Sequence, residues 1–235
     1  MLYFFAVGED VNSFNSKFFV SFIVVWNYSK LNFWLILGIL YYGENTNNRC
    51  VVITIGIDPS INCTGVCVHE SDTNSHIYYM IVGKTTKKMK SFRHDHINIL
   101  NYSKQETNKG EYQDKEYNKS HNIHRICSLI ETILDLFHPE FVQMEGVSYG
   151  SLGSAALVDL AGLNFAIRMT LIRKGIRFNV LAPTSVKKFA VGNGGAEKDV
   201  LIESWKRLDR NISDITDIKV DDLADSYFIA HYTTL

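Results

Sequence analysis

Three strand-like segments in succession, between residues 51 and 83, constrain the fold of this chain most strongly. VVITIGID, residues 51–58, is a β-branched run that is typical of a buried central strand. The turn PSINCTG leads into a second strand-like segment, VCVHES, and HIYYMIVG, residues 76–83, has the pattern of a third. Because strands joined by short turns pair in antiparallel fashion, this region predicts an antiparallel three-stranded meander.

Helical and strand-like segments alternate in the second half of the chain. Apolar residues recur at helical spacing between Ile126 and Phe137, and Pro139 ends that pattern. Two buried strands are expected at 141–147 and 178–183. Further helices are expected at 154–175, 184–189 and 196–208. This order predicts an α/β fold whose mixed sheet has three antiparallel strands followed by parallel strands, with helices at its sides.

Residues 1–49 differ from the rest of the chain in composition. The runs 18–26 and 33–42 are apolar, but neither reaches the roughly 20 residues that a membrane-spanning helix needs. Joining them would bury Lys30 in a bilayer, and Glu9 and Asp10 stand where a signal peptide carries positive charge. Three interpretations stay open: an anchor, an extra packing element, or upstream sequence that is not part of the working protein. We expect an extension that is dispensable for chemistry, no membrane attachment, and one domain at 50–235.

A long polar segment, residues 84–120, follows the meander. It carries nine Lys/Arg against five Asp/Glu and shows no sustained periodicity. We expect a solvated loop there. The alternative is a phosphate-contacting surface, densest in basic residues at Lys84, Lys87, Lys88, Lys90 and Arg93.

Charge and cysteine content exclude few classes of protein. The net charge of −1 does not by itself indicate a nucleic-acid binder. The cysteines form no CxxC pair, and Cys63 and Cys67 fall too far apart along one expected strand for a disulfide, which favours a reducing compartment. The histidine pairs 94/96 and 121/124 lack cysteine or carboxylate partners at zinc-like spacing, so no zinc site is expected.

The stretch VDDLADSYFIAHY, residues 220–232, places three aspartates at the start of an apolar, helix-compatible segment. Acidic residues are common there because the helix dipole favours negative charge in the first turn. Asp222 and Asp225, however, are three residues apart, so a helix carries both carboxylates on one face. Like charges held that close need a cation, so the pattern also indicates a metal site. Asp221 is expected to be an exposed neighbour.

Two further acids stand where buried strands are expected to end. Asp58 ends ITIGID and Glu145 ends VQME, and in α/β sheets functional groups collect beyond the carboxyl ends of strands. Each acid alone is explained as a turn or surface residue. Together with Asp222 and Asp225 they supply four oxygen donors, which suit Mg²⁺ or Mn²⁺. Two such ions, about 4 Å apart, would activate water and stabilise the departing oxygen of a phosphodiester.

The order of these motifs, from about residue 52 to 232, resembles the RuvC-type Holliday junction resolvases of the RNase H-like superfamily. ITIGIDPSINCTGVCV is similar to the family's first strand, acid and hairpin, which gives Asp58 the role of first metal ligand. FHPEFVQMEGV is similar to the strand that bears the second acid, here Glu145. DDLADSYFIA is similar to the closing pair of acids, here Asp222 and Asp225.

The resemblance also marks residues for DNA contact. APTSVKKFAVGNGGAEKDV is similar to the family's segment of lysines and glycines near the junction backbone, which matches Lys187, Lys188 and Lys198. Bacterial members carry a wedging aromatic residue three positions after the second acid. That position is Ser148 here, and Tyr149 is the expected substitute. This departure resembles phage or viral members that cleave branched DNA more broadly.

The resemblance implies an RNase H-like fold and a Mg²⁺-dependent endonuclease that nicks four-way DNA junctions. It also implies two ions per active site, no small-molecule cofactor, and a homodimer with one active site for each of two strands. We expect the protein in the cytoplasm, or in the host-cell compartment where phage or viral DNA is processed.

Several other functions are compatible with parts of the sequence. IGIDPSINCTG also resembles the first phosphate loop of actin-like and sugar-kinase-like nucleotide-binding proteins, but a second such loop is missing from the sequence. A non-catalytic junction-binding protein would not need four acids. A broader branched-DNA nuclease or an RNA/DNA-hybrid nuclease would use the same metal site.

Overall fold

The computed structural model describes residues 51–147, 154–212, 215 and 218–232, together with two short strands nearer the N-terminus. The chain divides into two compact units, Met1–Cys50 and Val51–Leu235. In the first unit, β1 (Phe18–Val20) pairs with β2 (Leu40–Tyr42) in antiparallel fashion. The remainder of the two apolar N-terminal runs lies outside the described residues.

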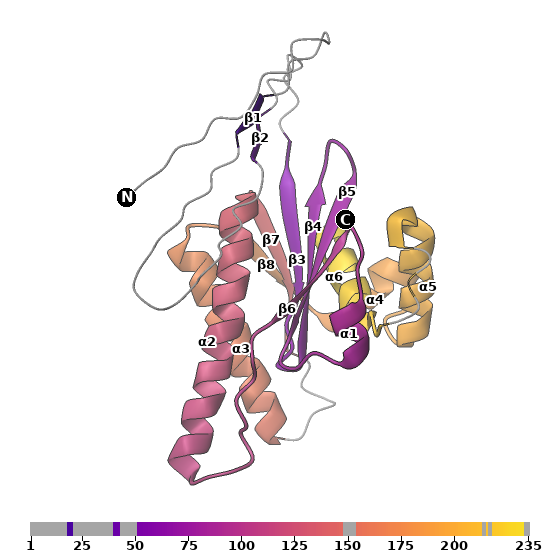
Figure 1. Cartoon of the computed structure of the whole chain (residues 1–235). Helices are drawn as coiled ribbons and strands as arrows, with labels where there is room; N and C mark the ends of the chain where they lie inside the picture. The colour runs from indigo at the N-terminus through magenta and orange to yellow at the C-terminus, as the bar shows by residue number, and fades with distance from the viewer. Residues whose placement is uncertain are drawn as a thin grey trace. The chain divides into compact units, whose positions relative to one another are not determined.

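The second unit is built on a six-stranded mixed sheet with the order β6-β5-β4-β3-β7-β8 (Figure 1). The strands are β3 (Ile53–Asp58), β4 (Cys63–Glu70), β5 (Ser75–Val82), β6 (Ile97–Asn101), β7 (Phe141–Glu145) and β8 (Arg177–Leu181). Strands β3, β4 and β5 form the expected antiparallel meander. Strand β7 is parallel to β3, and β8 is parallel to β7. The predicted mixed sheet is confirmed.

Helices cover both faces of this sheet (Figure 1). They are α1 (Lys87–Ser91), α2 (Tyr112–Phe137), α3 (Ser154–Arg173), α4 (Pro183–Val191), α5 (Lys198–Leu208) and α6 (Asp221–His231), with a 3₁₀ turn at Arg210–Ile212. Helices α2 and α3 pack on one face, and α4, α5 and α6 lie on the other. The alternation of β5 separates the two apolar layers, because Tyr78 and Met80 face α5 and α6 whereas Tyr79 and Ile81 face α2 and α3.

Helix α6 lies directly against β3 and β4, because glycines leave room for its backbone. A Cβ atom at Gly56 would collide with the Ser226 carbonyl and the Ala230 amide, and one at Gly65 would collide with the Asp222 carbonyl. The far end of the helix is also fixed, since the Gln143 Nε2 donates to the Tyr232 carbonyl at 2.9 Å. The sequence therefore holds both ends of α6 against the sheet.

The region 84–120 differs from the predicted loop, because it contains α1, β6 and the first two turns of α2. Helix α1 begins after Thr86, whose hydroxyl accepts a hydrogen bond from the Met89 amide. Strand β6 is an edge strand that runs parallel to β5 and buries Ile97 alone, so its period-two pattern is weak in the sequence. The polar start of α2 is supported by charge pairs rather than an apolar face, including Lys119 with Asp159 at 3.4 Å.

Helix α3 is the most apolar helix among the described residues. Its segment Ala155–Arg173 is long and apolar enough, by length and composition, to cross a membrane. Leu163, Ile167 and Leu171 are nevertheless fully buried in the layer between α2, α3 and the sheet. A core helix of a globular domain has the same composition, and this face of α3 fits that description.

Candidate active site

Four carboxylates meet where β3 and β7 end and α6 begins. Asp58 is the last residue of β3 and lies on the face covered by α6, because Ile55 and Ile57 alternate toward the other face. Glu145 is the last residue of the neighbouring parallel strand β7. The first turns of α6 supply Asp222 and Asp225, so the fold places all four predicted acids in one cluster.

Asp58 is buried and the other three acids are partly buried, and the electrostatics of the cluster show how close the acids lie. Asp58 is only 8 % exposed, and burial followed by the charges of Glu145, Asp225 and Asp222 raises its pKa well above the usual range. Burial and the Asp225 charge raise the pKa of Glu145 to about 7, and burial is also the main cause that raises the pKa of Asp225 to about 6. Four acids held this close and largely shielded from water cannot all ionise together without a compensating positive charge.

These residues fit a divalent cation. Asp58 and Glu145 end neighbouring strands, and each carboxyl group affects the pKa of the other. A hard cation placed among them would accept oxygen donors from all four acids. Carboxylate oxygens without a nearby imidazole are the donor set of Mg²⁺ or Mn²⁺ rather than of zinc.

Asp221 is not the exposed neighbour that the sequence predicted. It is 2 % exposed, and its Oδ2 accepts from the Lys198 Nζ at 2.5 Å and pairs with the Lys219 Nζ at 3.0 Å. Although burial acts to raise it, the two lysines hold the pKa of Asp221 below its usual value. The prediction was wrong because two basic side chains compensate this acid, which lets it be buried next to the cluster. This ion pair holds the Lys198 Nζ beside the cluster.

The structure brings two of the three predicted lysines to the carboxylates. Lys198 lowers the pKa of Asp58, and Lys187, whose Nζ donates to the Ala196 carbonyl at 3.1 Å, lowers the pKa of Glu145. Lys188, one residue further along α4, is exposed and is not among the main charges on the four acids. Tyr149 and Ser148 lie outside the described residues.

Two residues that the sequence analysis did not connect with the site support its carboxylates. The Cys63 thiol hydrogen-bonds to the Asp222 carboxylate and lowers its pKa, although burial raises that pKa overall. The Asn164 Nδ2 donates to the Glu145 carbonyl at 2.8 Å. A signal existed only for Asn164, as a polar residue in an apolar helix. Cys63 was considered as a possible disulfide partner.

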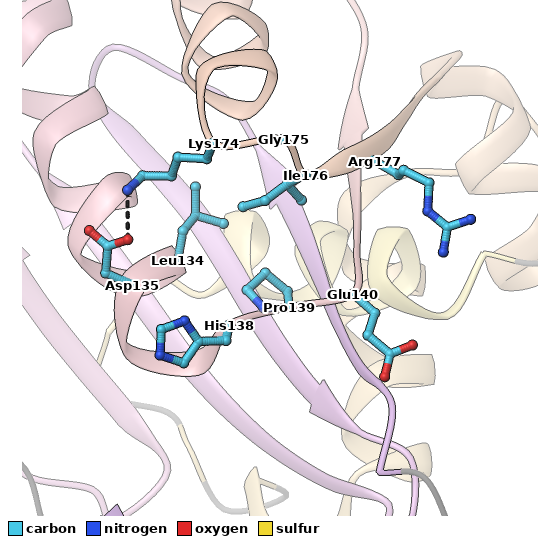
Figure 2. Close-up of a pocket in the computed structure, with 9 residues that line it drawn as sticks. All are labelled: Leu134, Asp135, His138, Pro139, Glu140, Lys174, Gly175, Ile176 and Arg177. Carbon is cyan, nitrogen blue, oxygen red and sulfur yellow. Dashed lines mark hydrogen bonds and ion pairs between the residues drawn. The ribbon is translucent and has the colours of Figure 1, made fainter.

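A hollow of about 460 Å³ lies at the opposite end of β7 and β8 (Figure 2). It is lined by the end of α2, the loop from His138 to Glu140, and the turn from Lys174 to Arg177. Lys174 is engaged there by Asp135 at 2.6 Å. Because these segments precede the strands, the hollow is at the amino ends of β7 and β8 and not at the carboxylates.

Fold and site together define a class of protein. A mixed sheet that begins with an antiparallel meander carries one acid from its first strand, one from a later parallel strand and two from the last helix. Buried carboxylates at the carboxyl ends of strands suit metal-assisted hydrolysis of phosphodiesters. These features define a nuclease of RNase H-like fold.

Comparisons with known proteins identify the family. The family of the crossover junction endodeoxyribonuclease RuvC matches residues 110–231, which are 122 of the 235 residues. The structure resembles that of Thermus thermophilus RuvC in complex with a Holliday junction substrate (TM-score 0.51, 18 % identity), with 76 % of this chain and 90 % of that chain covered. It also resembles the yeast mitochondrial Holliday junction resolvase Ydc2 (TM-score 0.46, 14 % identity), with 77 % and 76 % covered. A search among curated proteins gave no significant match.

The chain belongs to the RuvC family of crossover junction endodeoxyribonucleases. It is therefore a Holliday junction endonuclease, as the order of sequence motifs predicted. The matched residues 110–231 include Glu145, Asp222 and Asp225, whereas Asp58 lies before them and joins the cluster through the sheet. The family assignment decides against the actin-like nucleotide-binding alternative.

Proposed function

We propose that Asp58, Glu145, Asp222 and Asp225 hold the metal ions with which this endonuclease nicks four-way DNA junctions. Bound there, two Mg²⁺ or Mn²⁺ ions would supply an activated water and stabilise the departing oxygen of the phosphodiester. The observation that carries the proposal is the meeting of four acids from three separate segments in one cluster, with Asp58 buried and the other three partly buried. The side chains bind and orient, and none of them acts as a covalent nucleophile.

Three lysines are proposed to contact the DNA backbone. Lys198 stays 59 % exposed at its side chain while Asp221 fixes its Nζ beside the acids, so it can reach a phosphate at the scissile position. Lys187 is held by the Ala196 carbonyl on the other side of the Gly194–Gly195 turn, and Lys188 is exposed next to it. Basic side chains at these positions fix the register of the backbone without reading sequence. Tyr149 remains a proposed junction contact.

A homodimer is proposed because resolution needs one cut in each of two strands. Helix α3 supports the proposed homodimer, because exposed apolar residues recur along it at i, i+7, i+11 and i+14. Exposed apolar patches that are contiguous mark interaction surfaces. These α3 residues are 55–68 % exposed: Val158, Phe165, Met169 and Ile172. Asn164, on the same helix, hydrogen-bonds to the Glu145 carbonyl, so a second copy on α3 would lie next to the active site.

The proposed location is the cytoplasm or the host-cell compartment where phage or viral DNA is processed.

The proposal is tested with four labelled DNAs incubated side by side with Mg²⁺: a four-way junction, a Y-fork, an RNA/DNA hybrid and a linear duplex. We expect paired nicks in the junction and little cutting of the duplex. Asp58→Asn and Glu145→Gln should bind the junction in a gel-shift assay but not cut it. Glu140→Gln, an exposed acid next to the other end of β7, is the matched control and should cut normally.

Each outcome has a distinct meaning. Normal cutting by either active-site variant would contradict the assignment of the metal ligands. Cutting of the hybrid alone would contradict the junction as substrate. Cutting of all branched DNAs equally would favour the broader branched-DNA nuclease.

A further inference from the structure

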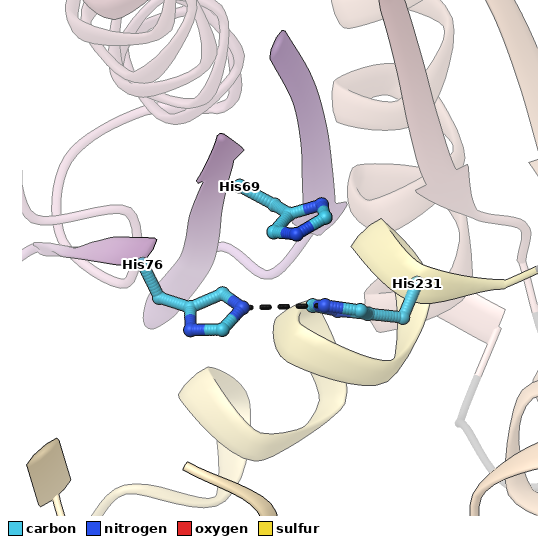
Figure 3. A group of neighbouring side chains, drawn as sticks. All are labelled: His69, His76 and His231. Carbon is cyan, nitrogen blue, oxygen red and sulfur yellow. Dashed lines mark hydrogen bonds between the residues drawn. The ribbon is translucent and has the colours of Figure 1, made fainter. Parts of the chain in front are cut away.

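Three histidines from separate elements converge at the other end of α6 (Figure 3). His69 belongs to β4, His76 to β5 and His231 to the last turn of α6. One ring nitrogen of each lies within 4.8 Å of the other two. His76 is 3 % exposed, and the other two are partly buried. The family's reaction makes no use of this cluster.

The fold itself brings these rings together. His69 and His76 are directly paired across the β4–β5 hairpin, so their side chains stand on the same face of the sheet. That face is the one covered by α6, as for Cys67 and Tyr78 on the same strands. His231 follows Asp222 by nine residues, so about 13 Å of helix separates the histidines from the carboxylates.

Hydrogen bonds fix which nitrogens of two rings carry protons. The His76 Nδ1 lies 3.1 Å from an oxygen of Asp209, whose pKa is lowered by its hydrogen-bond donors, so that Nδ1 bears the proton. The His231 Nδ1 lies 2.9 Å from the Tyr227 carbonyl and must donate to it. In the neutral rings, the Nε2 atoms of His76 and His231 are therefore unprotonated.

These two unprotonated atoms face one another at 3.2 Å. Two nitrogen lone pairs at that distance repel unless a proton or a metal ion lies between them. Imidazole nitrogens that are each about 2.05 Å from a tetrahedral ion lie about 3.3 Å apart. The 3.2 Å between these two nitrogens therefore fits a bound ion as well as a shared proton. Burial lowers the pKa of His231 to about 4, which favours the neutral ring.

We propose that His69, His76 and His231 bind one divalent transition ion of the zinc class. Neutral imidazole nitrogens are ligands for Zn²⁺, Co²⁺, Ni²⁺ and Cu²⁺, and not for the hard ions that suit the carboxylate cluster. The supporting shell is already present, because metal-bound histidines usually donate their other nitrogen to a carboxylate or a backbone carbonyl. Asp209 and the Tyr227 carbonyl are in those two positions. His69 is the partly exposed member, whose ring would turn toward the pair.

The ion would act as a clamp on the fold. Its ligands join the β4–β5 hairpin to the last turn of α6, 155 residues further along the chain from His76. The opposite end of the same helix carries Asp222 and Asp225. A clamp at His231 would fix the helix along its axis and so hold the two acids in register with Asp58.

The test uses the full chain without a polyhistidine tag, in saturating Mg²⁺ so that hard-ion sites are filled. Titration with Co²⁺ should give the intense visible absorption of a tetrahedral nitrogen site, saturating at one ion per chain, and Zn²⁺ should displace it. Asp58→Asn should show the same spectrum, which separates this site from the carboxylates. His231→Gln and His69→Gln should each lower the Zn²⁺ affinity at least tenfold.

His124→Gln is the matched control, since His124 is an exposed histidine on α2 that stacks only on His121 among the described residues, and it should bind Zn²⁺ like the wild type. Thermal unfolding keeps the test decisive if a variant folds poorly, because Zn²⁺ should raise the Tm of the wild-type protein. A wild-type protein with neither tetrahedral Co²⁺ absorption nor a Zn²⁺-dependent Tm would overturn the proposal and favour a proton shared by His76 and His231.

Discussion

The two ends of helix α6 carry opposite kinds of polar cluster. The first turns present Asp222 and Asp225 to Asp58 and Glu145, and burial raises the pKa of each of those carboxyl groups. The last turn presents His231 to two further imidazoles, and burial keeps it neutral. The start of α6 offers hard oxygen donors and its last turn offers nitrogen donors. The two clusters would therefore select different ions by donor chemistry.

Helix α6 is a rigid link between the two clusters. Ser226, in the middle of α6, and Ala230, in its last turn, approach Gly56 of β3 so closely that no side chain fits between them. A displacement at either end would therefore reach the other. The predictions below either separate the two ends or move them together, from the largest expected effect to the smallest.

The largest effect is expected from Asp58→Asn. Losing one oxygen ligand of the metal ions removes transition-state stabilisation of several kcal/mol, so cleavage should fall by about 100-fold or more. Single-turnover cleavage of a labelled four-way junction measures this. Zn²⁺ affinity in the same variant should stay within twofold of wild type, and a parallel loss of both properties would show that the two ends are not independent sites.

The next effect is expected from Gly56→Ala, which should disturb both ends together. The new methyl group would meet the Ser226 carbonyl and the Ala230 amide well inside van der Waals contact. Overpacking of this kind costs about 1–3 kcal/mol in unfolding free energy, which urea denaturation measures. Junction cleavage and Zn²⁺ binding should both weaken. Gly162→Ala on α3, where a Cβ meets only Ile123 at 3.4 Å, is the control and should not destabilise the protein.

The sequence was sufficient to predict the carboxylate end. Each of the four acids stands at a recognisable place, either the end of a buried strand or the first turns of a helix, and the sheet then brings those places together. The meander and the parallel strands were predicted because their apolar runs are long. Strand β6 was missed because it is an edge strand with a single buried side chain.

The histidine end could not be predicted, because its ligands are not neighbours in any local pattern. His69 and His76 face one another only through the register of the β4–β5 hairpin, which the turn sets. The histidines that are close in the chain, and so could be weighed as zinc ligands from sequence, are His94 with His96 and His121 with His124. Among the described residues, neither pair joins a group of three possible metal ligands.

The burial of Asp221, at the carboxylate end, could not be predicted from the local sequence either. Its burial depends on Lys198 from α5 and on Lys219, and only the folded chain places the α5 lysine at 2.5 Å. Local spacing suggested an exposed residue, because an acid at a helix start is usually solvated. Asp221 is buried because a distant segment compensates its charge.

A smaller effect, confined to the histidine end, is expected from Asp209→Asn. The amide can still hydrogen-bond to the His76 Nδ1 but carries no charge to raise the basicity of the ring. Loss of such a supporting carboxylate weakens metal affinity by about 10- to 100-fold. Competition between the protein and a Zn²⁺ chelator measures this change. Unchanged affinity would mean that the Asp209 contact serves only the packing of Tyr78, whose hydroxyl donates to Asp209 at 2.7 Å.

The smallest effect is a pH dependence of stability at the carboxylate end. The pKa of Glu145 rises from 4.5 to about 7 on folding, so the native state binds a proton more tightly than the unfolded chain. Its contribution to stability is therefore full below pH 4.5 and is lost as the pH rises to about 7. Urea denaturation of metal-free protein at pH 5 and pH 8 measures this. Glu145→Gln should remove part of the difference, and Mg²⁺ should reverse it at pH 8, because the cation stabilises the ionised carboxylates. At pH 8 the Zn²⁺-dependent increase in Tm should stay in place, since imidazoles are neutral above pH 7.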